Sequence, residues 1–152
     1  MVIAEESNDI RSHSSVEYIS GQHGFDLGLA CDLLEKTSWG AKRPRSAIER
    51  SFSNSWVLRA AHAKVQIGFL RIVSDFEFYA HIGDIYVAEQ WRLQGVGSGL
   101  LIAAFHSHEL QRVTSWHATS DVGAFFLAHG FRTMNADRNF VFRKAQTAED
   151  KL

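Results

Sequence analysis

Residues 84–110 read DIYVAEQWRLQGVGSGLLIAAFHSHEL, and this stretch decides the fold. Its apolar start predicts a strand over residues 82–87, and a polar turn follows. Glycines then stand at alternate positions, Gly95, Gly97 and Gly99. The residues after them are apolar at helical spacing and predict a helix: Leu100, Leu101, Ala104 and Phe105. The first turn of a helix has unpaired N–H groups that attract anions, so this strand–turn–helix is typical of a phosphate site.

Two common phosphate loops do not fit the glycine spacing. A Walker loop requires GxxxxGK[ST], and no lysine follows Gly97 or Gly99. A dinucleotide fingerprint requires GxGxxG, but Leu100 takes the third small position. What fits is Arg92-x-x-Gly95-x-Gly97, which resembles the acyl-CoA pyrophosphate loop of the GNAT N-acetyltransferases. The alternative interpretation is an ordinary glycine-rich turn between a strand and a helix.

Composition bounds the class of protein. The chain has 152 residues, 45% hydrophobic and 22% charged, which suits one globular domain. A formal net charge of −1 gives no global field for nucleic acid. The single cysteine, Cys31, excludes an internal disulfide framework and a thiolate zinc cluster. Without a transmembrane-like run or a signal-peptide pattern, we expect a cytoplasmic protein with no membrane partner and no metal.

The chain order predicts an α/β fold. We expect a flexible tail over residues 1–15 and a single acyl-CoA-binding domain over residues 16–152. The mixed central sheet should have about six or seven strands, with helices on both faces. Predicted strands cover 16–20, 56–61, 65–73, 82–87, 113–118 and a closing hairpin of 131–134 with 140–143. Predicted helices cover 27–37, a segment opened by Pro44, the apolar run after the glycines, and 121–128.

The resemblance to the GNAT family extends over about residues 16–143. It is closest to small bacterial-type, single-domain members. The matching segments are Trp39 with Arg43-Pro44, Asn54-Ser55, Gly68-Phe69 with Arg71, Asp75 with Phe78, residues 84–87, residues 118–121 and residues 129–131. The resemblance implies the GNAT fold, in which the strand before the glycine loop splays from the next to admit pantetheine. It also implies acetyl transfer from acetyl-CoA to an amine by direct attack in a ternary complex.

The same resemblance assigns the acetyl-CoA site. Backbone N–H groups from Leu93 to Ser98 would hold the pyrophosphate, with Arg92 and the Ser98 hydroxyl in support. Backbone groups of Ile85 and Val87 would pair with pantetheine as an added strand does. The full set of expected cofactor-binding residues is Ile85, Val87, Arg92, Leu93, Gln94, Gly95, Val96, Gly97, Ser98, Ser120 and Phe126.

One position departs from the family pattern. The closing helix of the family usually carries a tyrosine four residues before the Gly of Gly-Phe, and that tyrosine is thought to protonate the departing thiolate. Phe126 stands here and has no proton to give. A thiol has a pKa near about 8.5, so its thiolate can leave at neutral pH, and water, Ser120 or Tyr79 can substitute as the acid. Losing a general acid costs roughly 10² or more in rate.

The attacking amine must lose a proton, because its pKa is near about 10. Asp84, Asp75 and Glu77 are the candidate bases, and simple alternation puts Asp84 on the same face as Ile82 and Tyr86. The alternative to a base is a structural role for Asp84. In a hairpin around Glu77, Arg71 would lie opposite Asp84 and the two would form a cross-strand ion pair.

Acceptor-binding candidates come from predicted loops and, for Arg71, from the predicted strand over residues 65–73. An arginine there suits a carboxylate on the acceptor, and aromatic side chains suit a cationic or aromatic acceptor. The alternative is a surface arginine and packed aromatics. The candidates are Trp39, Arg43, Arg71, Asp75 and Phe78, with Phe76 and Tyr79 beside them.

The predicted activity is therefore N-acetylation of a small molecule, such as an amino acid or a polyamine-like acceptor. The alternative, motivated by Phe126, is a weakly active or non-catalytic acetyl-CoA-binding sensor or interaction module. Homodimers are common in the family, and no residue here decides for or against one.

Overall fold

The computed structural model describes residues 15–134. The predicted tail lies outside these residues except for Ser15, and so does the predicted strand over 140–143. The chain divides after Thr119 into two units, and we describe residues 15–119 and 120–134 separately. Among the helices of the described residues, none has the length and apolarity needed to cross a membrane.

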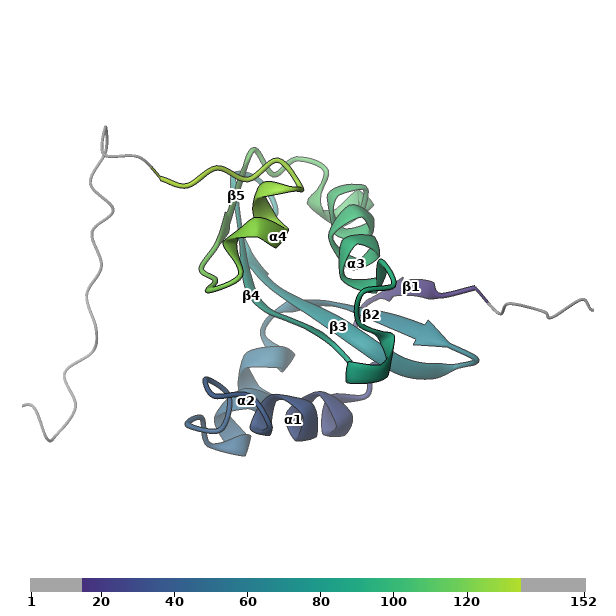
Figure 1. The fold of residues 1–152 in the computed structure, drawn as a ribbon. Helices are drawn as coiled ribbons and strands as arrows, with labels where there is room; N and C mark the ends of the chain where they lie inside the picture. The colour runs from purple at the N-terminus through teal and green to yellow at the C-terminus, as the bar shows by residue number, and fades with distance from the viewer. Residues whose placement is uncertain (1–14, 135–152) are drawn as a thin grey trace, which may run out of the picture. The chain divides into compact units, whose positions relative to one another are not determined.

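Residues 15–119 form a five-stranded sheet with the strands in sequence order (Figure 1). The strands are β1 (Glu17–Ser20), β2 (Trp56–His62), β3 (Val65–Ser74), β4 (Tyr79–Val87) and β5 (Ser115–Ala118). Strands β1 to β4 are antiparallel neighbours, and β5 pairs with β4 in parallel. This confirms the mixed α/β sheet, with five strands in the described residues rather than six or seven. Residues 131–134 have no strand assignment, so this half of the predicted closing hairpin was wrong, and its other half lies outside the described residues.

Two helices cover one face of the sheet, α1 (Leu27–Glu35) and α2 (Arg45–Ser53) (Figure 1). Helix α1 begins because the Asp26 carboxylate accepts the Leu29 N–H at 2.9 Å, and Pro44 precedes α2 as its N-cap. The core on this face is an aromatic cluster in which Phe52 contacts Phe69 edge to face, with ring centroids 5.6 Å apart. The other buried members are Ala30, Cys31, Leu34, Ile48 and Val57.

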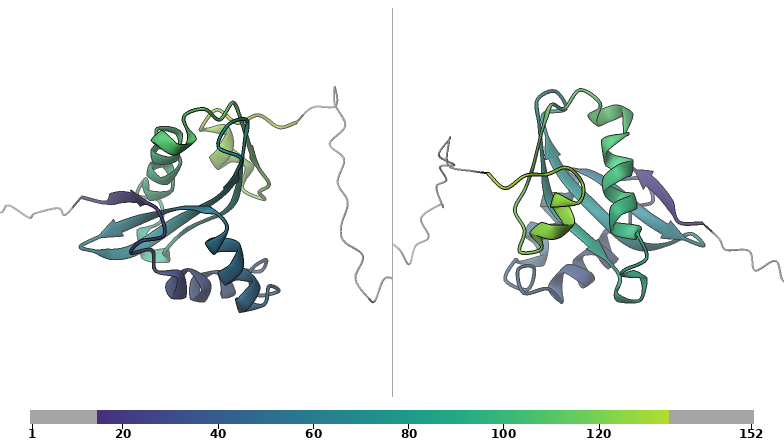
Figure 2. Two further views of the ribbon diagram at one scale, coloured as in Figure 1. Left: turned by 180° about the vertical axis from the view of Figure 1, so that it is seen from behind. Right: turned by 45° about the horizontal axis from the view of Figure 1, so that its top comes forward.

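Helix α3 (Val96–Phe105) covers the opposite face (Figure 2). Its inward side chains are fully buried, and burial of each leucine stabilises the fold by about 1.5–3 kcal/mol. The helix lies so close to β1 that a Cβ on Gly99 would overlap the phenol of Tyr18. The glycine at this position therefore permits the contact between helix and strand, in addition to any role in the turn. The buried set is Val96, Leu100, Leu101 and Ala104.

A β-bulge in β4 corrects the predicted face of one residue. Arg71 pairs with Asp84 and Ile72 pairs with Ile82, so Gly83 is the extra residue. The bulge places Asp84 and Tyr86 on the face covered by α1 and α2, and Ile82 on the face covered by α3. The sequence prediction that Asp84 and Ile82 share a face was therefore wrong, because simple alternation ignores the inserted residue. A side chain at Gly83 would overlap the guanidinium of Arg71.

Residues 120–134 contain the short helix α4 (Gly123–Leu127). The Ser120 hydroxyl accepts the Val122 N–H at 2.9 Å, just before the helix begins. Gly130 follows helix α4 and adopts the left-handed region with φ 86°, as expected for a glycine that terminates a helix. The Phe131 N–H then donates to the Phe126 carbonyl at 3.2 Å, which closes the turn after the helix.

Candidate active site

Strand β4 has a long edge that β5 does not cover. Pairing between the two strands ends at Ile82 with Ala118, although β4 continues to Val87. The Ala88 N–H donates to the Ile67 carbonyl on β3 at 2.8 Å. Because backbone groups alternate in direction along a strand, those of Ile85 and Val87 point away from β3. Within residues 15–134, these groups meet no further paired strand.

The uncovered edge leads directly into the glycine turn. A single 3-10 turn, η1 (Glu89–Trp91), follows β4. Leu93 and Gly95 then take positive φ values of 59° and 81°, and helix α3 begins at Val96. The positive end of a helix of ten residues therefore faces the turn. The structure thus brings together the predicted residues from Leu93 to Ser98 at one helix N-terminus, next to the uncovered edge of β4.

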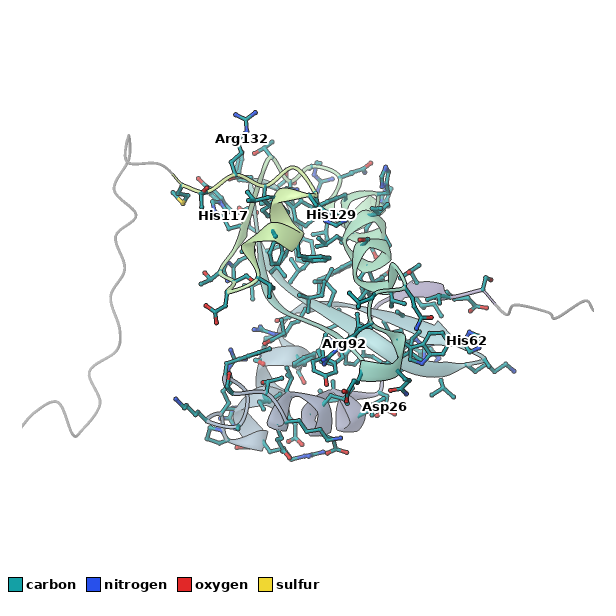
Figure 3. The ribbon with its side chains drawn as sticks, in the orientation of Figure 1. Asp26, His62, Arg92, His117, His129 and Arg132 are labelled. Carbon is teal, nitrogen blue, oxygen red and sulfur yellow. The ribbon has the colours of Figure 1, made fainter. Side chains whose placement is uncertain are left out.

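Arg92 folds back on the same edge (Figure 3). Its Nε donates to the Val87 carbonyl at 3.0 Å, and its guanidinium carbon lies 5.2 Å from the ring centroid of Tyr86. The Arg92 guanidinium therefore lies at the end of β4, beside Tyr86.

Asp84 lies between two arginines. Its side chain is fully buried, Oδ1 accepts from Arg43 Nη1 at 2.9 Å, and Oδ2 accepts from Arg71 Nε at 2.6 Å. Arg71 also donates to Ser55 Oγ at 3.1 Å. The predicted cross-strand ion pair is confirmed, and Arg43 adds a link from the α1–α2 loop that the sequence did not predict. Both carboxylate oxygens are engaged, which favours the structural role of Asp84 over proton transfer.

Asp75 builds the β3–β4 turn. Its Oδ1 accepts three backbone N–H groups, from Glu77 at 3.0 Å and from Phe78 and Tyr79 at 2.9 Å each. These bonds, with that from Tyr79 the largest, lower the pKa of the Asp75 carboxyl. The turn leaves Phe78 and Tyr79 exposed, and Glu77 contacts Arg112 at 2.7 Å.

A histidine pair that the sequence did not indicate lies near Arg71 and Asp84. His81 and His117 are register partners across β4 and β5, just before the two strands separate. Burial lowers the pKa of His81, and the nearby His117 and Arg71 lower it further, against the effect of Asp84. His81 is therefore largely neutral at neutral pH and can accept a proton. The signal in the sequence was weak, because the parallel register of two strands separated by a helix cannot be derived from alternation.

A cavity of about 550 Å³ lies on the α1 face of residues 15–119, where Tyr86 and Ala88 at the end of β4 contribute to its lining. Helix α1, the β2–β3 turn and η1 form its walls, and none of the predicted site residues lines it. His62 and Trp91 are among its lining residues, and their ring centroids lie 4.6 Å apart. Figure 3 labels His62. The apolar wall residues include Leu29, Leu33, Val65, Ile67 and Tyr86.

The two predicted cofactor residues beyond Thr119 lie in the separately described unit. Phe126 packs edge to face against Phe131, with ring centroids 5.2 Å apart, and Ser120 bonds to the backbone before α4. His129 (Figure 3), in the same unit, donates from Nδ1 to the Phe125 carbonyl at 2.8 Å. Among residues 15–134, histidine, cysteine and acidic side chains form no group of three that could hold a metal.

Comparison with known proteins assigns this arrangement to a family. A family model described as an acetyltransferase (GNAT) domain matches residues 51–133, which include β2 to β5, the glycine turn and α3. The chain is 30% identical over 122 residues to the histone acetyltransferase TAP1 of Glycine max. That match covers 70% of this chain but 51% of the relative, so the chain spans about half the length of that curated protein.

Solved structures share the fold. A protein of the GNAT family from Xanthomonas campestris pv. campestris matches with a TM-score of 0.78 at 24% identity, covering 86% of this chain and 94% of that one. A transcriptional regulator from Bacillus halodurans C-125 matches with a TM-score of 0.65 at 20% identity, covering 84% of this chain and 100% of that one. Because the family model spans more than half of the 152 residues and includes the glycine turn, the chain belongs to the GNAT acetyltransferase family.

Proposed function

We propose that the protein transfers the acetyl group of acetyl-CoA to the primary amine of a small molecule. The amine would attack the thioester directly in a ternary complex. The observation that carries this proposal is the uncovered edge of β4, which leads through the short turn η1 into the glycine-rich N-terminus of α3. Acetyl-CoA is an extended molecule with amide groups in its pantetheine arm and phosphates beyond it. The amides match the free backbone groups of a strand edge, and the phosphates match the N–H groups at a helix N-terminus.

In the proposed complex, pantetheine pairs with backbone groups of Ile85 and Val87. Backbone N–H groups from Leu93 to Ser98 bind the pyrophosphate, with Arg92 and the Ser98 hydroxyl in support. The structure fits this use because Leu93 and Gly95 adopt left-handed conformations that turn the chain into the helix start. Ser120 and Phe126, in the separately described unit, stay predicted cofactor-binding residues.

We propose His81 as the group that accepts the proton of the amine. The amine nitrogen forms a bond to the acetyl carbon, its proton passes to the neutral imidazole, and the carbon–sulfur bond breaks to release the CoA thiolate. A proton from water or from the hydroxyl of Tyr79 or Ser120 then reaches the sulfur. Asp84 holds Arg43 and Arg71 instead, since both of its oxygens already accept from them.

The test is isothermal titration with acetyl-CoA, followed by a thiol-release assay on the same sample with a panel of amines. Wild-type protein should bind acetyl-CoA and release thiol only when an amine is present. The Gly97→Trp variant should lose binding, because a side chain would fill the turn where the pyrophosphate is expected. Ile102→Trp is the matched control, since Ile102 is half exposed on the same helix. Full affinity in Gly97→Trp would contradict the assignment of the loop.

A second candidate function is a CoA-binding sensor or interaction module without turnover. Phe126 favours it, because this ring has no hydroxyl to protonate a departing thiolate. The sensor predicts tight acetyl-CoA binding with no amine-dependent thiol release across the panel. In that case Phe126→Tyr is the next comparison: a gain of turnover in the variant would identify the missing acid as the cause.

A further inference from the structure

The charged cluster around Asp84 carries more positive than negative charge. Arg43 and Arg71 together bring two positive charges, and Asp84 brings one negative charge. From this excess we propose that the acceptor is an amine that also carries a carboxylate, as an α-amino acid does, and that Arg43 binds the carboxylate. This inference rests on the proposed acetyl transfer and names its class of acceptor.

The excess charge lies on Arg43 rather than on Arg71. The side chain of Arg71 is only 12% exposed, donates to both Asp84 and Ser55, and lies over the ring of Phe52. Arg43 is 41% exposed and contacts Asp84 through Nη1. A guanidinium has five N–H donors, so Arg43 can keep its bond to Asp84 and still offer donors to a carboxylate.

Asp84 fixes the direction of Arg43. A fully buried carboxylate that accepts from Arg43 Nη1 at 2.9 Å holds one edge of the guanidinium against the sheet. The α1–α2 loop is therefore tied to β4, and the side chain is ordered before any acceptor arrives. Ordering a long side chain in advance reduces the entropy lost on binding, which strengthens a charge-assisted hydrogen bond.

The acidic side chains of the β3–β4 turn already have partners, which argues against a polyamine. Asp75 Oδ1 accepts three backbone N–H groups, and Glu77 contacts Arg112 at 2.7 Å. A second ammonium group on the acceptor would instead approach Arg43 and Arg71, which repel it. A carboxylate in the same position is attracted by these two arginines.

The spacing also suits a small amino acid. The bulge at Gly83 returns Asp84 to the face of β4 that carries His81, so these two lie on the order of 7–10 Å apart along the strand. Arg43 extends over Asp84, and His81 is the proposed proton acceptor. An amino acid bound between them can direct its amine toward His81 and its carboxylate toward Arg43.

The test compares each of the common L-α-amino acids with its carboxamide, which keeps the primary amine and removes the carboxylate charge; every kcat/KM is expressed per concentration of free amine, because the carboxylate raises the pKa of the amine. Wild-type kcat/KM for the best amino acid should exceed that for its carboxamide by about tenfold or more, as expected for a charge-assisted bond. In Arg43→Met this ratio should fall to near one through a rise in KM, with kcat largely kept. Arg43→Lys should give an intermediate ratio because it keeps the charge and loses the fork.

Lys42→Met is the matched control, since it removes a charge from the adjacent exposed residue and should leave the ratio unchanged. Acetyl-CoA affinity and the melting temperature of Arg43→Met report on folding. Titration of the best amino acid into the CoA-saturated protein gives a second readout, and its binding should disappear in Arg43→Met.

The outcomes separate this inference from the function on which it rests. Equal kcat/KM for amino acids and carboxamides in the wild type would overturn the role of Arg43 and leave acetyl transfer standing. A preference that survives in Arg43→Met would also overturn it. Acetyl-CoA binding with no thiol release for any amine would refute the transferase, and the inference about its acceptor with it.

Discussion

Gly83 lies directly under the guanidinium of Arg71, so closely that a Cβ at this position would overlap it. The same guanidinium donates from Nε to Asp84 at 2.6 Å. The bulge residue therefore makes room for the ion pair that joins β3 to β4. The β-bulge at Gly83 and the ion pair of Arg71 with Asp84 therefore depend on each other.

Gly83→Ala should destabilise the fold. The added methyl group forces Arg71 away from Asp84 or shifts the bulge, and overpacking of this kind costs about 1–3 kcal/mol. Urea unfolding followed by circular dichroism measures the change. Gly28→Ala is the control, because its Cβ would have its nearest neighbour at 3.6 Å and alanine is favoured in helix α1. Equal stability of Gly83→Ala and the wild type would contradict the packing described here.

His81 and Asp84 should differ in what their removal affects. His81→Gln should lower kcat by about 10²–10⁴ with little loss of stability, as expected when a general base is removed. Asp84→Asn should mainly lower stability, by about 3–5 kcal/mol, because it leaves two arginines beside a neutral amide. Thermal melting and kcat measured well below the melting temperature separate the two effects. A large loss of kcat in a folded Asp84→Asn protein, with full activity in His81→Gln, would reverse the assignment.

The rate should depend on pH through His81. Its pKa is lowered, mainly by burial, so the imidazole stays neutral to a pH below its ordinary value near about 6.5. The acid limb of the kcat–pH profile should therefore lie at pH values below that one. It should be absent from the profile of the residual rate of His81→Gln. Rates with a weakly basic amine acceptor keep the titration of the substrate out of the measured range.

Asp75 should stabilise the fold in a pH-dependent way. Backbone N–H groups lower its pKa in the folded state, so the unfolded chain binds its proton at a higher pH than the folded chain does. The stabilisation is present above the unfolded pKa near about 3.9 and is lost as pH falls through the folded pKa. The stability difference between wild type and Asp75→Asn, measured by urea unfolding from neutral to acid pH, should shrink below about pH 4. A difference that stays constant over that range would mean that the ionised carboxylate is not what holds the turn.

Arg92→Met should weaken acetyl-CoA binding by about tenfold, because it removes one charge-assisted contact with the pyrophosphate. The loss should be smaller at high salt, where screening reduces the contribution of Arg92 in the wild type. Isothermal titration at two salt concentrations measures both effects. Arg50→Met, on the exposed surface of α2, is the control and should match the wild type.

Local patterns in the sequence predicted most of the fold but little of the charged cluster. The glycine spacing predicted the turn and helix α3, and the hairpin around Glu77 predicted that Arg71 faces Asp84, because both depend on residues near in the chain. The bulge at Gly83 was missed, since nothing in the residue alternation indicates an inserted residue. Arg43 reaches Asp84 across 41 positions, a contact set by how α1 and α2 pack on the sheet.

Strand ends were predicted less well than strand centres. Strand β4 begins at Tyr79 rather than at Ile82, and β5 begins at Ser115 rather than at Val113. The early start of β4 is what places His81 inside the strand and opposite His117. A short error in a strand boundary therefore concealed the residue that we propose as the base.

Arg92 already occupies the carbonyl of Val87 to which the pantetheine arm is proposed to bind. In that complex the cosubstrate competes with a side chain of the protein, and binding becomes an exchange in which Arg92 leaves the strand edge as the pyrophosphate draws it toward the helix. The net contribution of Arg92 to the affinity is then its gain at the phosphates minus its loss at Val87, and the gain must be the larger for Arg92→Met to weaken binding. Ligands that have the pantetheine arm but lack the pyrophosphate would meet the competitor without the means to displace it.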